Sequence, residues 1–165
     1  MNIGLDMMGG DFAPLEAVKG AADFIASTTN TAIHLTLIGD ETKIREHLAD
    51  HPIAAGRYSI VHAAQVIGMH EHPTKALKEK QQSSIAVGFH LLATGKADAF
   101  ISAGNTGAML VGTMYTIKTI EGVSRPTIPT IVPKLNGATG LLLDVGLNVD
   151  CKPEHLNHFA ILGGQ

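Results

Sequence analysis

The stretch Ile3-Gly4-Leu5-Asp6, followed at once by Met7-Met8-Gly9-Gly10-Asp11, decides how the start of this chain folds. A short apolar run that stops at an acid and a pair of glycines is typical of a buried parallel strand that ends in a tight loop. Three further apolar runs end in Gly, Asp or Ser, at residues 33–39, 99–102 and 141–144. We expect these four runs to be buried strands of one parallel sheet, with another strand near residues 58–62.

Segments with helical spacing separate the runs. Apolar side chains recur at intervals of three and four residues from Leu15 to Ile25, directly after Pro14, a residue well suited to a first helical turn. Similar signals predict helices at residues 40–48, 85–95 and 110–117, and after Pro153. Residues 125–133 hold three prolines, which favour an irregular connection or an edge strand. The alternation predicts an α/β fold: a mostly parallel sheet with helices on both faces, in three α/β/α layers.

Composition limits the class of protein. With 165 residues and 45% hydrophobic content, the chain is expected to form a single α/β domain over residues 1–165. The net charge of -3 gives no general attraction to nucleic acid or to an anionic membrane surface. A single cysteine, Cys151, excludes a disulfide scaffold and fits a reducing cytoplasm. No apolar run approaches the roughly 20 residues of a membrane-spanning helix, and the start does not match a signal peptide.

Three loops at the ends of predicted strands combine glycine with polar side chains. Gly9 and Gly10 lie between Asp6 and Asp11, the segment 102–108 reads Ser-Ala-Gly-Asn-Thr-Gly-Ala, and the segment 144–148 runs from Asp to Asn. Taken singly, each has a plain structural interpretation, as a tight turn or a helix cap. Ligands of open α/β sheets gather at the carboxyl ends of strands, where loops present backbone donors. Together the loops therefore predict a site for an anionic ligand.

Positive charge is concentrated in one segment. Residues 75–80 contain three lysines, and Ser83 and Ser84 follow closely. A solvated helix face is the favoured interpretation, and cations beside a phosphate or an acidic partner are the alternative. Arg125 is a second candidate for phosphate, because guanidinium binds oxyanions in bidentate fashion. The nine histidines show no third ligand at a recognisable spacing, so we expect no metal site.

Read together, these loops resemble the bacterial phosphate acyltransferase (PlsX) family. The matching segments, in family order, are residues 5–14, 75–84, 102–108, 122–126, 143–148 and 151–153. Met7 and Leu147 depart from the pattern, since each stands where the family usually has alanine. The resemblance implies an isocitrate-dehydrogenase/phosphotransacetylase-like fold. Family members are about twice as long as this chain, so the resemblance implies the amino-terminal part of a longer enzyme.

The resemblance also implies a reaction: a fatty acyl group moves from an acyl-carrier-protein thioester to inorganic phosphate, and the acyl phosphate serves phospholipid synthesis. Phosphate is itself the nucleophile, so neither an acyl-enzyme nor a cofactor is expected. Acyl carrier protein and phosphate are the implied partners, with no nucleic acid. The family suggests a cytoplasmic homodimer that contacts the inner face of the membrane through its other half.

The site residues follow from the same resemblance. Asn105, Lys75 and Lys80 are the predicted catalytic residues, and replacement of Asn105 by Ala is expected to lower turnover with folding intact. The predicted substrate-binding and phosphate-binding residues are Asp6, Gly9, Gly10, Asp11, Ser83, Ser102, Gly104, Thr106, Gly107, Arg125, Asp144 and Asn148.

Three alternatives remain open. The first is a phosphotransacetylase-like enzyme that uses a coenzyme A thioester. The second is a nucleotide-dependent dehydrogenase, although the Gly-x-Gly-x-x-Gly pattern is absent after the first predicted strand. The third is a noncatalytic domain, because an active site at a domain junction needs both of its walls.

Overall fold

A computed structural model describes residues 1–123 and 125–164, which form two compact units, Met1–Lys118 and Thr119–Gln165. Ser124, part of one matching segment, lies outside the described residues. The single domain expected over residues 1–165 stays a prediction, and each unit is described by itself. Within the described residues, no helix is long and apolar enough to cross a membrane.

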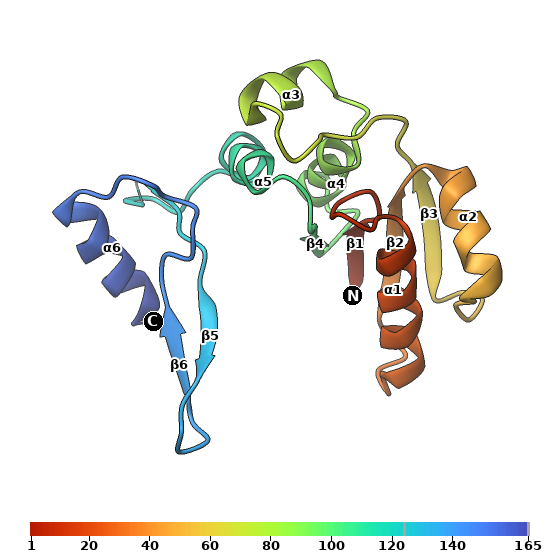
Figure 1. Cartoon of the computed structure of the whole chain (residues 1–165), viewed down its shortest axis with the longest axis horizontal. Coiled ribbons are helices and arrows are strands. Elements are labelled where there is room, and N and C mark those ends of the chain that lie inside the picture. The colour runs from red at the N-terminus through yellow and green to blue at the C-terminus, as the bar shows by residue number, and fades with distance from the viewer. Residues whose placement is uncertain (124, 165) are drawn as a thin grey trace. The chain divides into compact units, whose positions relative to one another are not determined.

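The first unit is built on a parallel sheet of four strands (Figure 1). The strands are β1 (Asn2–Asp6), β2 (His34–Gly39), β3 (Tyr58–His62) and β4 (Ala99–Ile101). Their order across the sheet is β3-β2-β1-β4, and all three pairings are parallel. Each predicted strand in this unit is confirmed to within one residue at either end.

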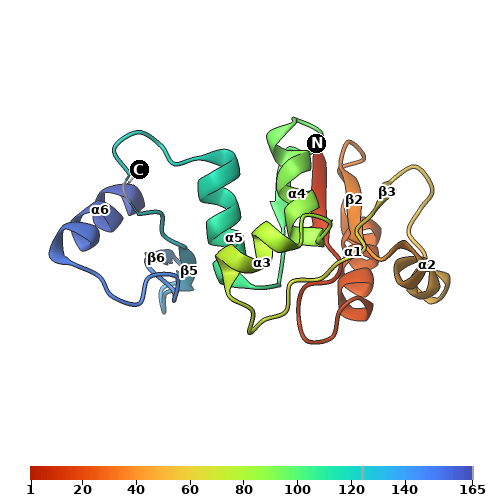
Figure 2. The same ribbon diagram turned by 90° about the horizontal axis from the view of Figure 1, so that it is seen from above.

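Helices cover both faces of this sheet. The helical elements of the unit are α1 (Leu15–Ser27), α2 (Glu41–Asp50), α3 (Pro73–Glu79), α4 (Ser84–Ala93), α5 (Thr106–Gly112) and the π-helix η1 (Thr113–Ile117). Seen from above, α1 and α2 lie on one face and α4 on the other (Figure 2). The predicted three-layer α/β/α fold is therefore confirmed. The helix predicted over residues 110–117 is the end of α5 together with η1.

The alternation of side chains along the strands explains the layers, because successive residues point to opposite faces. Leu35 and Leu37 of β2 are buried with Val18 and Ile25 of α1 on one face. On the other face, Phe89 of α4 and Phe100 of β4 pack edge to face, with ring centroids 5.4 Å apart. Full burial of each such side chain contributes about 1.5–3 kcal/mol to folding.

The strand order places a crevice between β1 and β4. From β1 the chain continues outward to β2 and β3, and it then returns to pair β4 with the opposite side of β1. The connections at this point therefore leave the sheet in opposite directions, and such a switch point is where open α/β sheets bind ligands. The loops after β1 and β4 are the two walls of this crevice.

The second unit contains a hairpin and a helix. Strands β5 (Thr130–Pro133) and β6 (Thr139–Leu142) pair antiparallel, and α6 (Pro153–Gly163) begins at the predicted proline. The buried parallel strand predicted for residues 141–144 is thus wrong, while β5 agrees with the predicted edge strand. The physical reason is the Asn136-Gly137 turn, since Gly137 has a φ of +80° and the hairpin pairs residues 139–142 locally.

Candidate functional site

The loops after β1 and β4 pack directly against each other. A methyl group added to Gly9 would lie 2.6 Å from the amide nitrogen of Gly104 and 2.7 Å from Oδ2 of Asp6. Only glycine allows this approach of two backbones. The next residue, Gly10, has a φ of +100°, a conformation that other residues rarely adopt. The two predicted glycine loops therefore meet at the switch point of the sheet.

Asp6 connects the two loops through its carboxylate. The side chain is only 6% exposed. Its Oδ1 accepts a hydrogen bond from the amide of Met8 at 2.9 Å, and its Oδ2 accepts one from Oγ of Ser102 at 2.7 Å. The Ser102 hydroxyl in turn accepts from the amide of Gly104 at 3.0 Å. This chain of charge-assisted hydrogen bonds fixes the spacing of the loops.

A cavity opens beside these loops. Its volume is about 530 Å³, and Gly9, Gly10, Asp11, Ser102 and Ala103 line one end of it. Five of the predicted site residues, Asp6, Gly9, Gly10, Asp11 and Ser102, line this cavity, and a sixth, Gly104, donates a hydrogen bond to Ser102. The remaining walls come mostly from the sheet and from α1, and apart from Glu16 their lining is apolar.

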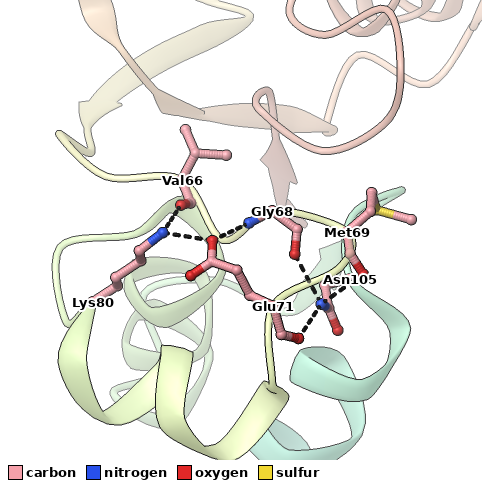
Figure 3. A network of polar contacts seen from close by, with 6 residues as sticks. All are labelled: Val66, Gly68, Met69, Glu71, Lys80 and Asn105. Atoms are coloured by element: carbon pink, nitrogen blue, oxygen red, sulfur yellow. Dashed lines mark hydrogen bonds and ion pairs between the residues drawn. The ribbon is translucent and has the colours of Figure 1, made fainter.

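Asn105 is buried, with 4% of its surface exposed, and its amide is fully engaged (Figure 3). Oδ1 accepts from the amide of Ala108 at 2.9 Å and so caps α5. Nδ2 lies 3.0–3.2 Å from the carbonyl oxygens of Gly68, Met69 and Glu71. An amide offers two N–H donors, and both are directed at this loop. The contacts support a positioning role for Asn105, and its predicted contact with phosphate stays a prediction.

Glu71 and Lys80 form a second clamp on the same loop. Nζ of Lys80 lies 2.5 Å from Oε1 of Glu71 and donates to the carbonyl of Val66 at 2.8 Å, while the amide of Gly68 donates to Glu71 at 2.6 Å (Figure 3). The hydrogen bond from Lys80, followed by that from Gly68, holds the pKa of Glu71 below its usual value. The ammonium group predicted to bind phosphate is therefore paired. Sequence reasoning missed Glu71, because a pair nine residues apart across a loop has no periodic signature.

The other predicted residues of the first unit occupy different surroundings. Lys75 is exposed on α3. Ser83 is buried and its hydroxyl accepts a hydrogen bond from the amide of Ala86 at 3.3 Å, so it caps α4, and its predicted contact with substrate stays a prediction. Thr106 and Gly107 form the first turn of α5, where a methyl on Gly107 would lie 2.4 Å from Cγ of Pro73. Gly107 therefore serves the close packing of α5 against α3.

In the second unit, Asp144 organises a separate network. Its Oδ1 accepts from the amide of Ile128 at 3.0 Å, and its Oδ2 accepts from the backbone and side-chain nitrogens of Asn148. Nη1 of Arg125 donates to the carbonyl of Asp150 at 2.7 Å. Burial raises the pKa of Asp144, but the hydrogen bonds from Ile128 and Asn148 outweigh it and lower the pKa overall.

The lowered pKa of Asp144 predicts a pH-dependent contribution to stability. A carboxyl group whose folded-state pKa is depressed stabilises the fold above its unfolded-state pKa of about 3.9, and the stabilisation is lost as the pH falls through the folded-state value. We expect Asp144→Asn to lower the free energy of unfolding by about 1 kcal/mol at neutral pH and by progressively less below pH of about 4. Urea denaturation across this pH range measures the difference. The matched control is Asp150→Asn, which changes an exposed carboxylate. If Asp144→Asn lowered the free energy of unfolding by the same amount at every pH, the lowered pKa of Asp144 would be contradicted.

No three His, Cys, Asp or Glu side chains gather in the described residues as a metal site requires. The two loops combine glycine backbones with one buried carboxylate that orders them and with a hydroxyl group at the end of β4.

The fold is shared with phosphotransacetylases of known structure. A phosphotransacetylase from Streptococcus pyogenes superposes on 98% of this chain with a TM-score of 0.66, at 19% identity and over 51% of its own length. The EutD phosphotransacetylase from Staphylococcus aureus gives a TM-score of 0.65 at 22% identity, again over 98% of this chain and 51% of its own. At these identities the likeness is one of fold.

Sequence similarity identifies the family to which the chain belongs. The family described as "Fatty acid synthesis protein" matches residues 1–165, and the chain belongs to this family, that of the phosphate acyltransferases (PlsX). It is 45% identical to proteins named phosphate acyltransferase from Desulforamulus reducens, Dictyoglomus turgidum and Geobacter sulfurreducens. Each match covers 99% of this chain and 46–48% of the relative, so the chain spans about half the length of these relatives. The predicted family is confirmed.

Proposed function

We propose that the protein transfers an acyl group from a thioester to inorganic phosphate. An oxygen of phosphate attacks the thioester carbonyl carbon, a C–O bond forms, the C–S bond breaks, and the thiolate leaves and takes up a proton. The products are an acyl phosphate and a free thiol. The observation that carries this proposal is the contact between the β1 and β4 loops through Gly9, Gly104 and the Asp6–Ser102 hydrogen bond.

The proposed role of these loops is positioning. The absence of Cβ atoms at Gly9 and Gly104 lets the two loops pack together, and backbone amides of these loops stabilise the charge that develops on the reacting oxygens in this proposal. Correct placement of two reactants alone supplies roughly 7–11 kcal/mol of the barrier. Asp6 acts by fixing the spacing between the two loops through its hydrogen bonds. The proposal needs no protein nucleophile, because phosphate fills that role.

Positive charge for phosphate comes, in this proposal, from Lys75 and Arg125, whose roles are carried over from the family resemblance. Lys80 contributes indirectly, because its pairing with Glu71 fixes the loop that Asn105 also holds. The remaining predicted binding residues, Asp11, Thr106, Asp144 and Asn148, are proposed to shape the pocket of the complete enzyme.

The proposed donor is an acyl-carrier-protein thioester, and the proposed product serves phospholipid synthesis. The names of the relatives support acyl transfer to phosphate. We propose a cytoplasmic homodimer with peripheral membrane contact for the complete enzyme, as the family suggests. The second candidate donor is a coenzyme A thioester, which the phosphotransacetylase fold favours.

A donor comparison tests the proposal. The full-length enzyme that carries this chain is supplied with phosphate and either an acyl-carrier-protein or a coenzyme A thioester of the same acyl chain. Thiol release and trapping of acyl phosphate with hydroxylamine are measured together. We expect both signals to require phosphate and to be faster with the carrier-protein donor. A faster reaction with the coenzyme A thioester would make that thioester the donor in place of the carrier-protein thioester. Thiol release that does not depend on phosphate would overturn the proposed transfer to phosphate.

A further inference from the structure

The loop at residues 66–72, which lies between β3 and α3, is closed by one carboxylate (Figure 3). Oε1 of Glu71 accepts hydrogen bonds from the amide of Gly68 at 2.6 Å and from Nζ of Lys80 at 2.5 Å. Lys80 also donates to the carbonyl oxygen of Val66, at the start of the loop. Glu71 therefore fastens the two ends of the loop to each other and, through Lys80, to the C-terminal end of α3.

The same loop determines where α3 begins. His72 is the N-cap residue of α3, and Pro73 is its first residue. A methyl group added to Gly107 would lie 2.4 Å from Cγ of Pro73, so the first turns of α3 and α5 are in close contact. Lys75 lies only two residues after Pro73, in the same turn of α3. The loop therefore places the backbone of Lys75 beside the end of the β4 loop, where α5 starts.

The pair formed by Glu71 and Lys80 is too exposed to serve stability alone. Their side chains are 37% and 31% exposed. Ion pairs with this access to water contribute little to the free energy of unfolding, because solvent screens them. Lys80 is nevertheless committed to the loop, since its ammonium group donates both to Glu71 and to the carbonyl oxygen of Val66. The contribution of the pair therefore lies mainly in the geometry of the loop.

We propose that Glu71 is a positioning residue, which acts through Lys80 and the loop to set the place of Lys75 relative to the β4 loop. The proposal rests on the proposed function, in which Lys75 supplies positive charge to phosphate. Glu71 does not itself contact phosphate in this proposal, because a carboxylate repels an anion. A displacement of about 1 Å in a group that positions a substrate can lower the rate roughly 100-fold. Control of one loop is therefore enough to control the site.

Two roles for Lys80 predict opposite results when Glu71 is removed. If Lys80 bound phosphate directly, Glu71→Ala would release its ammonium group and remove a nearby negative charge, so phosphate would bind at least as tightly. If Lys80 acts through the loop, Glu71→Ala loosens the loop and weakens phosphate binding, and Lys80→Met does the same. The two side chains then act as one unit, so the double variant binds phosphate no more weakly than either single variant.

Calorimetric titration of inorganic phosphate into the full-length enzyme that carries this chain tests the proposal. We expect Glu71→Ala and Lys80→Met each to raise the Kd for phosphate about tenfold, and the double variant to raise it no further. Lys80→Arg keeps a cation opposite Glu71 and should leave the Kd unchanged. The matched control is Glu41→Ala, which breaks the exposed 2.7 Å pair with Arg45 on α2 and should also leave it unchanged.

Two results of this titration would overturn the proposal. Phosphate binding by Glu71→Ala that equals or exceeds that of the unmodified enzyme would assign Lys80 a direct contact with phosphate. A lower Tm of Glu71→Ala with an unchanged Kd would give Glu71 a structural role only.

Steady-state kinetics separate this inference from the proposed function. Glu71→Ala is expected to raise the KM for phosphate and to leave the KM for the thioester donor unchanged, because the loop acts on the phosphate side of the reaction. An equal rise in both KM values would indicate a general disturbance of the site and would overturn the inference. If the unmodified enzyme makes no acyl phosphate from any donor, the proposed function fails, while the titration still decides whether Glu71 controls phosphate binding. An unmodified enzyme that binds no phosphate would overturn both.

Discussion

Asn105→Asp is expected to lower the free energy of unfolding of the first unit by roughly 3 kcal/mol or more. The substitution is nearly isosteric and keeps an oxygen that can cap α5 through Ala108. It replaces the Nδ2 donor, however, by a second oxygen that faces the carbonyl groups of Gly68, Met69 and Glu71. This second oxygen, buried among carbonyl oxygens, has neither solvent nor a donor to offset its charge. Urea denaturation measures the loss.

Asn30→Asp is the control for this change. Asn30 is exposed, and its side-chain oxygen accepts a hydrogen bond from the amide of Ala32, a contact that aspartate preserves. We expect a change within about 0.5 kcal/mol. Asn105→Ala should fall between the two, because it removes the cap and the donors without adding charge. This revises the expectation that Asn105→Ala leaves folding intact. Equal stability of Asn105→Asp and Asn30→Asp would mean that the amide does not hold the loop.

Gly9→Ala is expected to separate the two site loops. The new methyl group would lie 2.6 Å from the amide nitrogen of Gly104, a backbone atom that cannot rotate away. Either the β1 loop or the β4 loop must move, which costs about 1–3 kcal/mol of stability. The hydrogen bond between Asp6 and Ser102 spans the same gap and would lengthen. We expect thermal denaturation to show the loss of stability, and acyl phosphate formation by the full-length enzyme to fall well below that of the unmodified protein.

The control for Gly9→Ala is Gly20→Ala in α1, where an added methyl meets nothing within 4 Å. A glycine in the interior of a helix costs about 0.5–1 kcal/mol relative to alanine, so this variant is expected to be more stable. The two substitutions add the same atoms and should change stability in opposite directions. A neutral effect of Gly9→Ala would mean that the loops separate at no cost, and would remove the support for a fixed spacing between them.

Local signals explain which parts of the fold were predictable. The strands at residues 3–6 and 33–39 were predicted to within one residue of the bounds that the structure shows, because a buried parallel strand is an apolar run between polar breaks. The run at 141–144 has the same composition but pairs in a hairpin. The decisive signal, Asn136-Gly137, lies outside the run itself. Composition identified a strand there but could not identify its partner.

The candidate site was predictable to a similar extent. Asp6 ends β1 and Ser102 follows β4, and general rules for parallel sheets place such residues at one edge. Their direct hydrogen bond depends on β4 pairing with β1, a contact between residues 96 positions apart that the sequence does not display. The contacts of Asn105 were not predictable for another reason. Its acceptors are backbone carbonyls, which every residue carries, so side-chain identity provides no signal for them.

The position of β4 in the sheet has a consequence for self-association. A strand whose outer edge is unpaired presents backbone donors and acceptors that can recruit the same edge of another copy, and this is a common route to aggregation. Here β4, the last strand in the order of the four-stranded sheet, comprises only Ala99–Ile101. Its short length leaves little room for a ladder between molecules. The edge of the sheet that adjoins the crevice is thus a poor site for strand pairing between copies, and the longer strand β3 forms the other edge.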